Sequence, residues 1–142
     1  LYPVCKAQMD TSLSYVDADG QLVLSDDYPV FIDWSDQFDK STAGQGVMIY
    51  CLRRFLELAE QAGDAELSAY RESLVLMESY ARDHLLDRSR MLFVSGPDGE
   101  YNLASQVWMV LSGILTEKEQ HAVMRHAADE LLPTHTGKYS IL

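Results

Sequence analysis

The feature of this sequence that most constrains its fold is an internal repeat. Four residues of one segment return 61 residues later: Ala43, Gln45, Met48 and Ile49 recur as Ala104, Gln106, Met109 and Val110. Both copies open an apolar helical run that follows a polar, turn-rich stretch. Because a period of about 60 residues accommodates two helices and their connections, the repeat predicts an array of about two αα-hairpins.

The composition is that of a globular, mostly helical chain. Its 142 residues are 47% hydrophobic, which is enough to build a core. The net charge of −11 argues against nucleic acid and anionic membranes as partners, because both attract cationic surfaces. We interpret the acidity as a solubility device rather than as the sign of an acid-specific partner. No apolar run approaches the ~18 residues of a membrane span.

The cysteines and the ends of the sequence carry two further expectations. Cys5 and Cys51 are too few for a disulfide framework or a zinc site, and Cys51 is predicted to be a buried thiol because its helical run is apolar. The sequence begins without Met or a signal segment and ends where a third unit would start. We therefore expect residues 1–142 to be a fragment of a single domain, and no compartment is predicted.

The first 38 residues are predicted to be the least regular part. Asp19 and Gly20 form a turn signal between two apolar pairs, which indicates a short β-hairpin or an extended region. The pattern from Asp17 to Gly20 resembles the start of a calcium loop. The later acidic ligands and the closing glutamate are missing, so calcium is not expected.

Four helices are expected after this stretch. The first spans 41–61, is buried on every side in its first half around Val47, Ile49 and Tyr50, and is ended by Gly63. The second is capped by Asp64, extends to residue 85 and keeps a charged face. The third spans 102–114, follows a short strand or extended link at 91–94 and is almost wholly apolar. The fourth starts at a capping box of Thr116 and Glu119 and ends at Pro133.

This order of inner, outer, inner and outer helices predicts where functional residues gather. The two inner helices run parallel, so their N-termini lie at one end, together with Asp33, Trp34, Asp36, Asp39, Lys40, Asp98, Glu100, Tyr101 and Asn102. Carboxylates and amides bind sugar hydroxyls, and aromatic rings stack on the C–H face of a sugar, so this set favours a carbohydrate. For Asp36, Asp39 and Asp98 the alternative is a helix-start acid stabilised by the helix dipole.

The remaining polar residues favour structural roles. Gln45 and Gln106 are each predicted to bind the backbone of a neighbouring loop rather than a ligand. His84, His121 and His126 fall on outer helices, and no pair has the spacing of a metal site. No phosphate loop or dinucleotide motif is present, so neither a metal nor a cofactor is expected.

Several blocks resemble the catalytic domain of family 78 glycoside hydrolases, the bacterial α-L-rhamnosidases. They are Phe31-Ile32-Asp33-Trp34, Phe38-Asp39-Lys40, Ala43 to Tyr50, Ala104 to Leu111 and Thr136 to Ser140. The resemblance implies an (α/α)6 toroid, a ring of six αα-hairpins, with Asp33 and Trp34 lining the substrate pocket and Asp36 and Asp39 as weaker candidates. It also implies that the general acid precedes this region and that the general base follows it, so no catalytic residue is assigned here.

The resemblance favours part of a glycosidase that acts on α-L-rhamnosides or related sugars, with inversion by two carboxylates. The alternative is a non-catalytic helical-repeat module that binds protein or carbohydrate. We expect the fragment alone to be inactive, and to self-associate or pair with the rest of its own domain.

Overall fold

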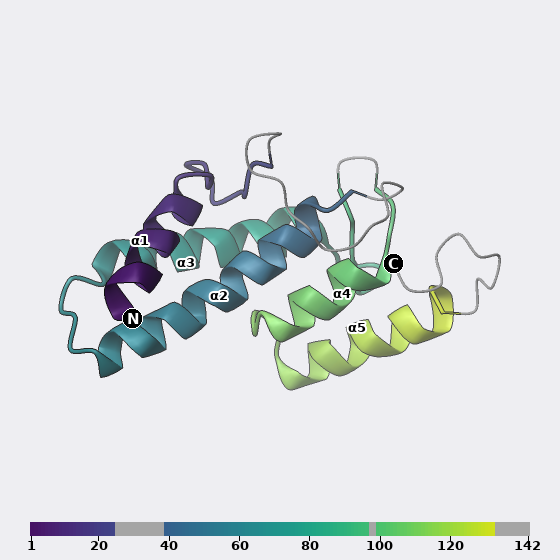
Figure 1. Cartoon of the computed structure of the whole chain (residues 1–142). Coiled ribbons are helices and arrows are strands. Elements are labelled where there is room, and N and C mark those ends of the chain that lie inside the picture. Colours follow the sequence, from purple (N-terminus) through teal and green to yellow (C-terminus); the bar gives the residue numbers. More distant parts are fainter. Residues whose placement is uncertain (25–38, 97–98, 133–142) are drawn as a thin grey trace.

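The computed structural model describes residues 1–24, 39–96 and 99–132, and most of them are helical (Figure 1). The elements in chain order are α1 (Tyr2–Leu13), α2 (Ser41–Gln61), α3 (Ser68–Tyr80), a π-helical turn η1 (Ala81–Leu85), β1 (Leu86–Asp87), β2 (Leu92–Phe93), α4 (Leu103–Leu111) and α5 (Glu117–Glu130). None of the described helices combines the length and apolar character needed to cross a bilayer.

Helix α2 is the central element, and it begins and ends where the sequence predicts. Its stripe of Met48, Leu52, Phe55 and Ala59 is buried against its neighbours. Gly63 follows the helix with a φ of +76°, a conformation that glycine adopts without strain. The helix therefore forms the core as expected from its 3,4-spacing.

Two predictions are wrong for the flank of α2 that faces α1. Ile49 is fully buried, but Val47 is half-buried and Tyr50 is 37% exposed, so the first half of α2 is not buried on every side. Cys51 is exposed rather than buried. The physical reason is that Val47, Tyr50 and Cys51 line a groove between α1 and α2.

The N-terminal region contains a helix that the sequence analysis missed. Helix α1 is held by contacts with distant residues of the chain. The Tyr2 ring stacks on Phe55 with centroids 6.0 Å apart, and Lys6 forms an ion pair with Asp64 at 2.6 Å. Asp64 does not cap the next helix as predicted, because that helix starts four residues later, at Ser68, without a side-chain cap. The predicted hairpin is present as a β-bridge between Val16 and Leu22.

The second half of the chain contains the predicted elements, although α4 ends at Leu111 rather than at residue 114, because Gly113 leaves the helical conformation with a φ of +80°. Strand β2 pairs antiparallel with β1 and leads into α4, whose N-cap is Asn102. Both hydrogen bonds of the predicted Thr116–Glu119 capping box are formed at the start of α5. The described part of α5 buries Val123 and Ala127 toward α4.

Helices α2 and α4 run parallel and in register, as the repeat predicts (Figure 1). Near their N-termini the Asn102 amide approaches the Asp39 carbonyl at 3.4 Å, and at the other end Arg53 donates to the Gly113 carbonyl at 3.3 Å. Between these points Gly46 packs so closely that an added Cβ would lie 2.8 Å from the backbone of Trp108. The spacing of contacting residues stays near 61 along the whole interface.

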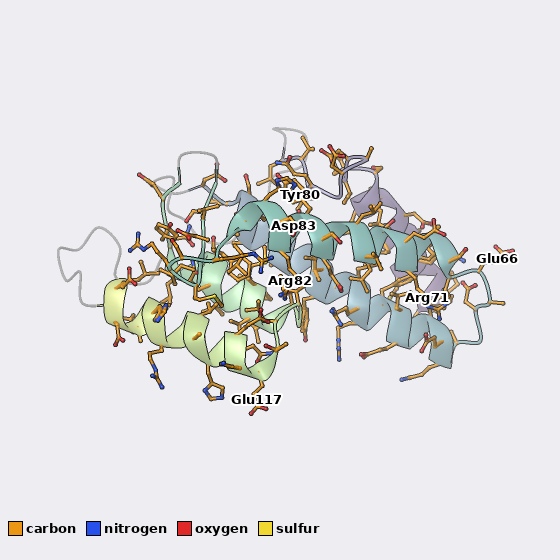
Figure 2. The ribbon with its side chains drawn as sticks, turned by 180° about the vertical axis from the view of Figure 1, so that it is seen from behind. Glu66, Arg71, Tyr80, Arg82, Asp83 and Glu117 are labelled. Carbon is orange, nitrogen blue, oxygen red and sulfur yellow. The ribbon has the colours of Figure 1, made fainter. Side chains whose placement is uncertain are left out.

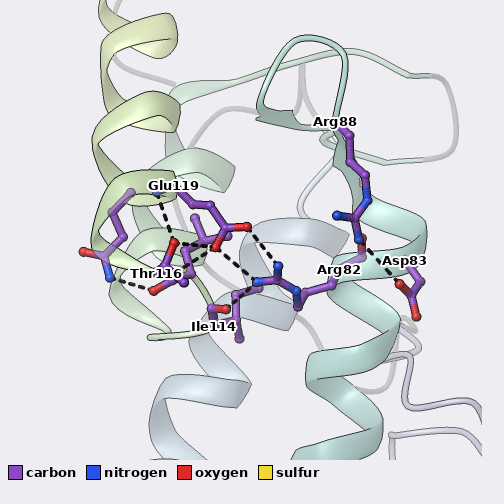
Figure 3. A network of polar contacts seen from close by, with 8 residues as sticks. Arg82, Asp83, Arg88, Ile114, Thr116 and Glu119 are labelled. Atoms are coloured by element: carbon purple, nitrogen blue, oxygen red, sulfur yellow. Dashed lines mark hydrogen bonds and ion pairs between the residues drawn. The ribbon is translucent and has the colours of Figure 1, made fainter.

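The outer elements connect the two αα-hairpins, which are α2 with α3 and α4 with α5. Seen from behind, α3 lies in front of α2, with Glu66 and Arg71 near its start and Tyr80, Arg82 and Asp83 near its end (Figure 2). Arg82 donates to the Ile114 carbonyl at 2.7 Å and to the Glu119 carboxylate at 2.9 Å (Figure 3). Because Glu119 also belongs to the capping box, one carboxylate links the end of the first hairpin to the turn between α4 and α5 in the second.

Candidate functional site

The candidate site is the end of the molecule where α2 and α4 both begin, which we call the shared end. Its described residues are 39–46 and 95–106, without 97 and 98. The Thr42 amide donates to the Ser95 carbonyl at 3.2 Å, which joins the start of α2 to the loop before α4. The structure therefore brings together the two segments that the sequence places at one end.

Two buried glutamines build this end in the same way. Gln45 is 1% exposed; its Oε1 accepts from the Leu22 amide at 2.7 Å and its Nε2 donates to the Gly20 carbonyl at 2.7 Å. Gln106 is fully buried and makes the same pair of bonds to the amide and carbonyl of Phe93, both at 2.7 Å. Each glutamine thus holds the extended segment before its helix, which confirms the predicted structural role.

Asp39 is the predicted site residue that the structure describes. It is half-buried, its Oδ1 accepts from the Ser41 amide at 2.7 Å, and its carboxylate covers Gly96 so closely that a side chain there would overlap it. This geometry matches a helix-start acid. A role of Asp39 in binding stays a prediction, and Asp33, Trp34, Asp36 and Asp98 lie outside the described residues.

The residues that precede α4 are occupied by structural contacts. Asn102 is 3% exposed, and its Oδ1 caps α4 by accepting from the Ser105 amide at 2.7 Å. The Tyr101 hydroxyl donates to Asp87 at 2.7 Å, and the Arg90 guanidinium lies 4.5 Å from the centre of the Tyr101 ring. Both side chains therefore support the loop, whereas Glu100 is exposed at the shared end.

These contacts also set the local electrostatics. Hydrogen bonds from the Ser89 and Tyr101 hydroxyls lower the pKa of Asp87 to about 2. The same bond to Asp87, together with burial, raises the pKa of the Tyr101 hydroxyl. Asp87 is therefore a permanent carboxylate at neutral pH and serves as an acceptor, which is unlike the protonated state of a general acid.

Three buried hydroxyls at the shared end were not singled out from the sequence. Thr42, Ser95 and Ser105 are at most 1% exposed, and within the described residues their hydroxyl oxygens have no hydrogen-bond partner. A small hydroxyl residue at the start of an otherwise apolar helix is the signal that marks Thr42 and Ser105. In the described part of the chain, no group of three His, Cys, Asp or Glu side chains is arranged to hold a metal ion.

Comparisons with known proteins test the resemblance seen in the sequence. No protein-family model and no curated protein matches this sequence. Among solved structures, a rhamnosidase from Klebsiella oxytoca with rhamnose bound matches with a TM-score of 0.85 and 37% sequence identity. The match covers 92% of this chain and 25% of that enzyme, so the chain spans a quarter of the length of its relative. The resemblance seen in the sequence is thereby confirmed: over most of its length the chain is similar to part of a rhamnosidase, as expected for a partial rhamnosidase-like domain.

Proposed function

We propose that this chain is part of the catalytic domain of a glycoside hydrolase that acts on α-L-rhamnosides or related sugars. The observation that carries the proposal is the match to a rhamnosidase that was solved with rhamnose bound. At 37% identity over nearly the whole chain, the likeness extends beyond the fold to the sequence.

The shared end is the proposed substrate-binding face. Asp33, Trp34 and Asp36 precede Asp39 by at most six residues in the sequence, and Asp39 lies where α2 and α4 begin. In this proposal the three aspartates accept hydrogen bonds from sugar hydroxyls, and the indole of Trp34 stacks on the apolar face of the ring. The buried glutamines and the Asn102 cap hold the helix starts that carry these residues.

The proposed reaction is inverting hydrolysis by two carboxylic groups. One acts as a general acid on the leaving oxygen, while the other activates a water molecule on the opposite face of the sugar. Neither role is assigned to a residue of this chain, because the sequence resemblance implies that both groups lie in neighbouring parts of the domain. The residues of this chain bind and orient the sugar.

The test is turnover of aryl glycosides by the longer protein that contains this segment. We expect hydrolysis of an aryl α-L-rhamnoside, little hydrolysis of an aryl β-D-glucoside, and an inverted product in a time-resolved NMR spectrum. Rhamnose binding without turnover would point to a carbohydrate-binding module instead. If the longer protein neither binds nor cleaves the rhamnoside, the alternative of a protein-interaction module takes its place.

A further inference from the structure

The loop between β2 and α4 contains a glycine that its backbone conformation does not require. Gly96 lacks the positive φ that Gly99 shows in the same loop, where φ is +71°. A residue with a side chain could therefore adopt the backbone of Gly96. Space excludes that side chain instead, because the three atoms nearest to a Cβ added at Gly96 all belong to the side chain of Asp39.

Asp39 is held in this position and has little room to move aside. Its Oδ1 accepts from the Ser41 amide at 2.7 Å, and its carbonyl accepts from the Asn102 side-chain amide at 3.4 Å. A Cβ added at Gly96 would lie 2.5 Å from the Cβ of Asp39, so rotation of the carboxylate would not remove the overlap. A side chain at position 96 would therefore force the two backbones apart.

Hydrogen bonds transmit the position of Gly96 to the rest of its loop. The carbonyl of the buried Ser95 accepts from the Thr42 amide at 3.2 Å, and the Ser95 amide donates to the Glu100 carbonyl at 2.6 Å. The Gly99 amide donates to the Gly96 carbonyl at 3.2 Å. The contact between Asp39 and Gly96 thus sets how far the exposed Glu100 lies from the start of α2.

We propose that Asp39 and Gly96 are positioning residues for sugar binding, because their contact fixes the spacing between the two halves of the shared end. One half is the segment that enters α2, in which Asp33 and Trp34 precede Asp39. The other half is the loop that carries Glu100. A sugar that contacts both halves binds well only at the correct spacing. The inference rests on the proposed function, and it gives Asp39 a role besides its proposed hydrogen bond to the sugar.

The test is the kinetics of Gly96→Ala in the longer protein that contains this segment, with an aryl α-L-rhamnoside as substrate. We expect KM to rise about tenfold because the binding face is widened. The value of kcat should stay within about twofold, since the acid and the base are proposed to lie in other parts of the domain. The control is Gly63→Ala, which has a φ of +76° and no neighbour within 4 Å, and lies beyond the opposite end of α2. It should lower the melting temperature and leave KM unchanged.

A second background shows whether the alanine acts through Asp39. Asp39→Gly removes all the atoms that overlap the added Cβ, and by itself it should raise KM because the contact and the bond to the sugar are both lost. Adding Gly96→Ala to this variant should then change KM by less than about twofold, since the effects of two residues in contact are not additive. A tenfold rise in both backgrounds would show that the two residues act independently, and it would overturn the positioning role.

Asp39→Asn separates the spacing from the charge, and it keeps the inference testable if Gly96→Ala does not fold. Asparagine has the size of aspartate and its Oδ1 can still accept from the Ser41 amide, so KM should rise at most a third as much as in Asp39→Gly. An equal rise in both variants would assign the effect to the carboxylate charge and overturn the positioning role. An unchanged KM in a folded Gly96→Ala variant would also overturn it while the proposed function stands. A parent protein that does not cleave the rhamnoside would overturn the proposed function itself, and the positioning role with it.

Discussion

At the scale of single residues, two glutamines at equivalent positions of the sequence repeat make equivalent contacts in the structure. A glutamine amide has the same donor and acceptor as a peptide group, so it can pair with an extended backbone from within a helix. Gln45 and Gln106 use this property at equivalent positions, on Leu22 with Gly20 and on Phe93. Burial makes both bonds obligatory, since an unpaired backbone group away from water is costly.

This role predicts a large effect of Gln106→Leu. The substitution leaves the amide and the carbonyl of Phe93 buried without partners, so we expect the free energy of unfolding to fall by about 2–5 kcal/mol. Urea denaturation followed by circular dichroism measures the loss. Gln61→Leu is the control: Gln61 is exposed at the end of α2, and its replacement should cost less than about 0.5 kcal/mol. Comparable losses in both variants would contradict the role of the buried amide.

Trp34 carries the residue-scale prediction for binding. Trp34→Ala in the full-length protein should weaken sugar binding by about 1–3 kcal/mol, the value of one aromatic face. Calorimetric titration with rhamnose gives the change, and a thermal melt checks that the variant is folded. Unchanged affinity and turnover in a folded variant would exclude Trp34 from the pocket.

At the scale of elements, the sequence was most informative where local chemistry and packing agree. The end of α2 follows from a glycine, the start of α5 from a capping box, and the parallel register of the inner helices from a fixed period. The start of α2 at Ser41 has no side-chain cap. Helix α1 escaped prediction because its stripe of Tyr2, Cys5 and Met9 is continued by a polar residue, Ser12, which is buried here. Its stability comes from partners about 60 residues away, which a local pattern does not reveal.

The candidate site was predictable in position more than in detail. The shared end follows from helix order alone, and the structural use of Gln45 and Gln106 follows from amides in apolar surroundings. The contact of Tyr101 depends on where Asp87 lies, and Asp87 belongs to β1, a strand of two residues without a sequence signal. Cys51 was misplaced for a related reason, since an apolar run does not tell which flank of a helix is covered.

The close crossing of α2 and α4 makes Gly46 sensitive to a single methyl group. In an exposed helix, Gly→Ala stabilises by about 1 kcal/mol. At Gly46 the added Cβ would lie 2.8 Å from the Trp108 backbone, so we expect Gly46→Ala to destabilise by about 1–3 kcal/mol instead. Thermal unfolding compares it with Gly63→Ala, which meets no neighbour within 4 Å and should cost about 1 kcal/mol for its positive φ. A stabilised Gly46→Ala variant would contradict the close crossing.

The link between the hairpins should appear in the pH dependence of stability. The Arg82 guanidinium, with the Thr116 backbone and hydroxyl, lowers the pKa of Glu119 from 4.5 to about 2. A carboxylate whose pKa is lower in the folded state stabilises the fold above its unfolded pKa, and this contribution is lost as pH falls from about 4.5 toward 2. Melting temperatures between pH 7 and pH 2 should therefore fall less steeply in Glu119→Gln than in the parent chain. The control is Glu117→Gln, at an exposed position of the same helical turn, whose melting temperature should fall with pH as steeply as that of the parent chain. If the melting temperatures of all three proteins fall in parallel, Glu119 does not contribute to the pH dependence of stability.

At the scale of the whole molecule, the exposed groove and the proposed division of catalytic groups lead to one prediction about the chain by itself. It should show no glycosidase activity, because the acid and the base of the proposed mechanism lie in other parts of the domain. It should also self-associate at micromolar concentration, because the groove leaves Val4, Val47 and Leu58 in contact with water, and exposed apolar patches drive association. Aryl rhamnoside hydrolysis and light scattering measure the two properties on one preparation. Val47→Glu should reduce the association by placing a charge in the groove, while Val75→Glu on the exposed side of α3 should leave it unchanged.

Robust turnover by a 16.0 kDa monomer would require a complete acid–base pair within these 142 residues. It would overturn both the division of catalytic groups between parts of the domain and the role of the shared end as a binding face alone.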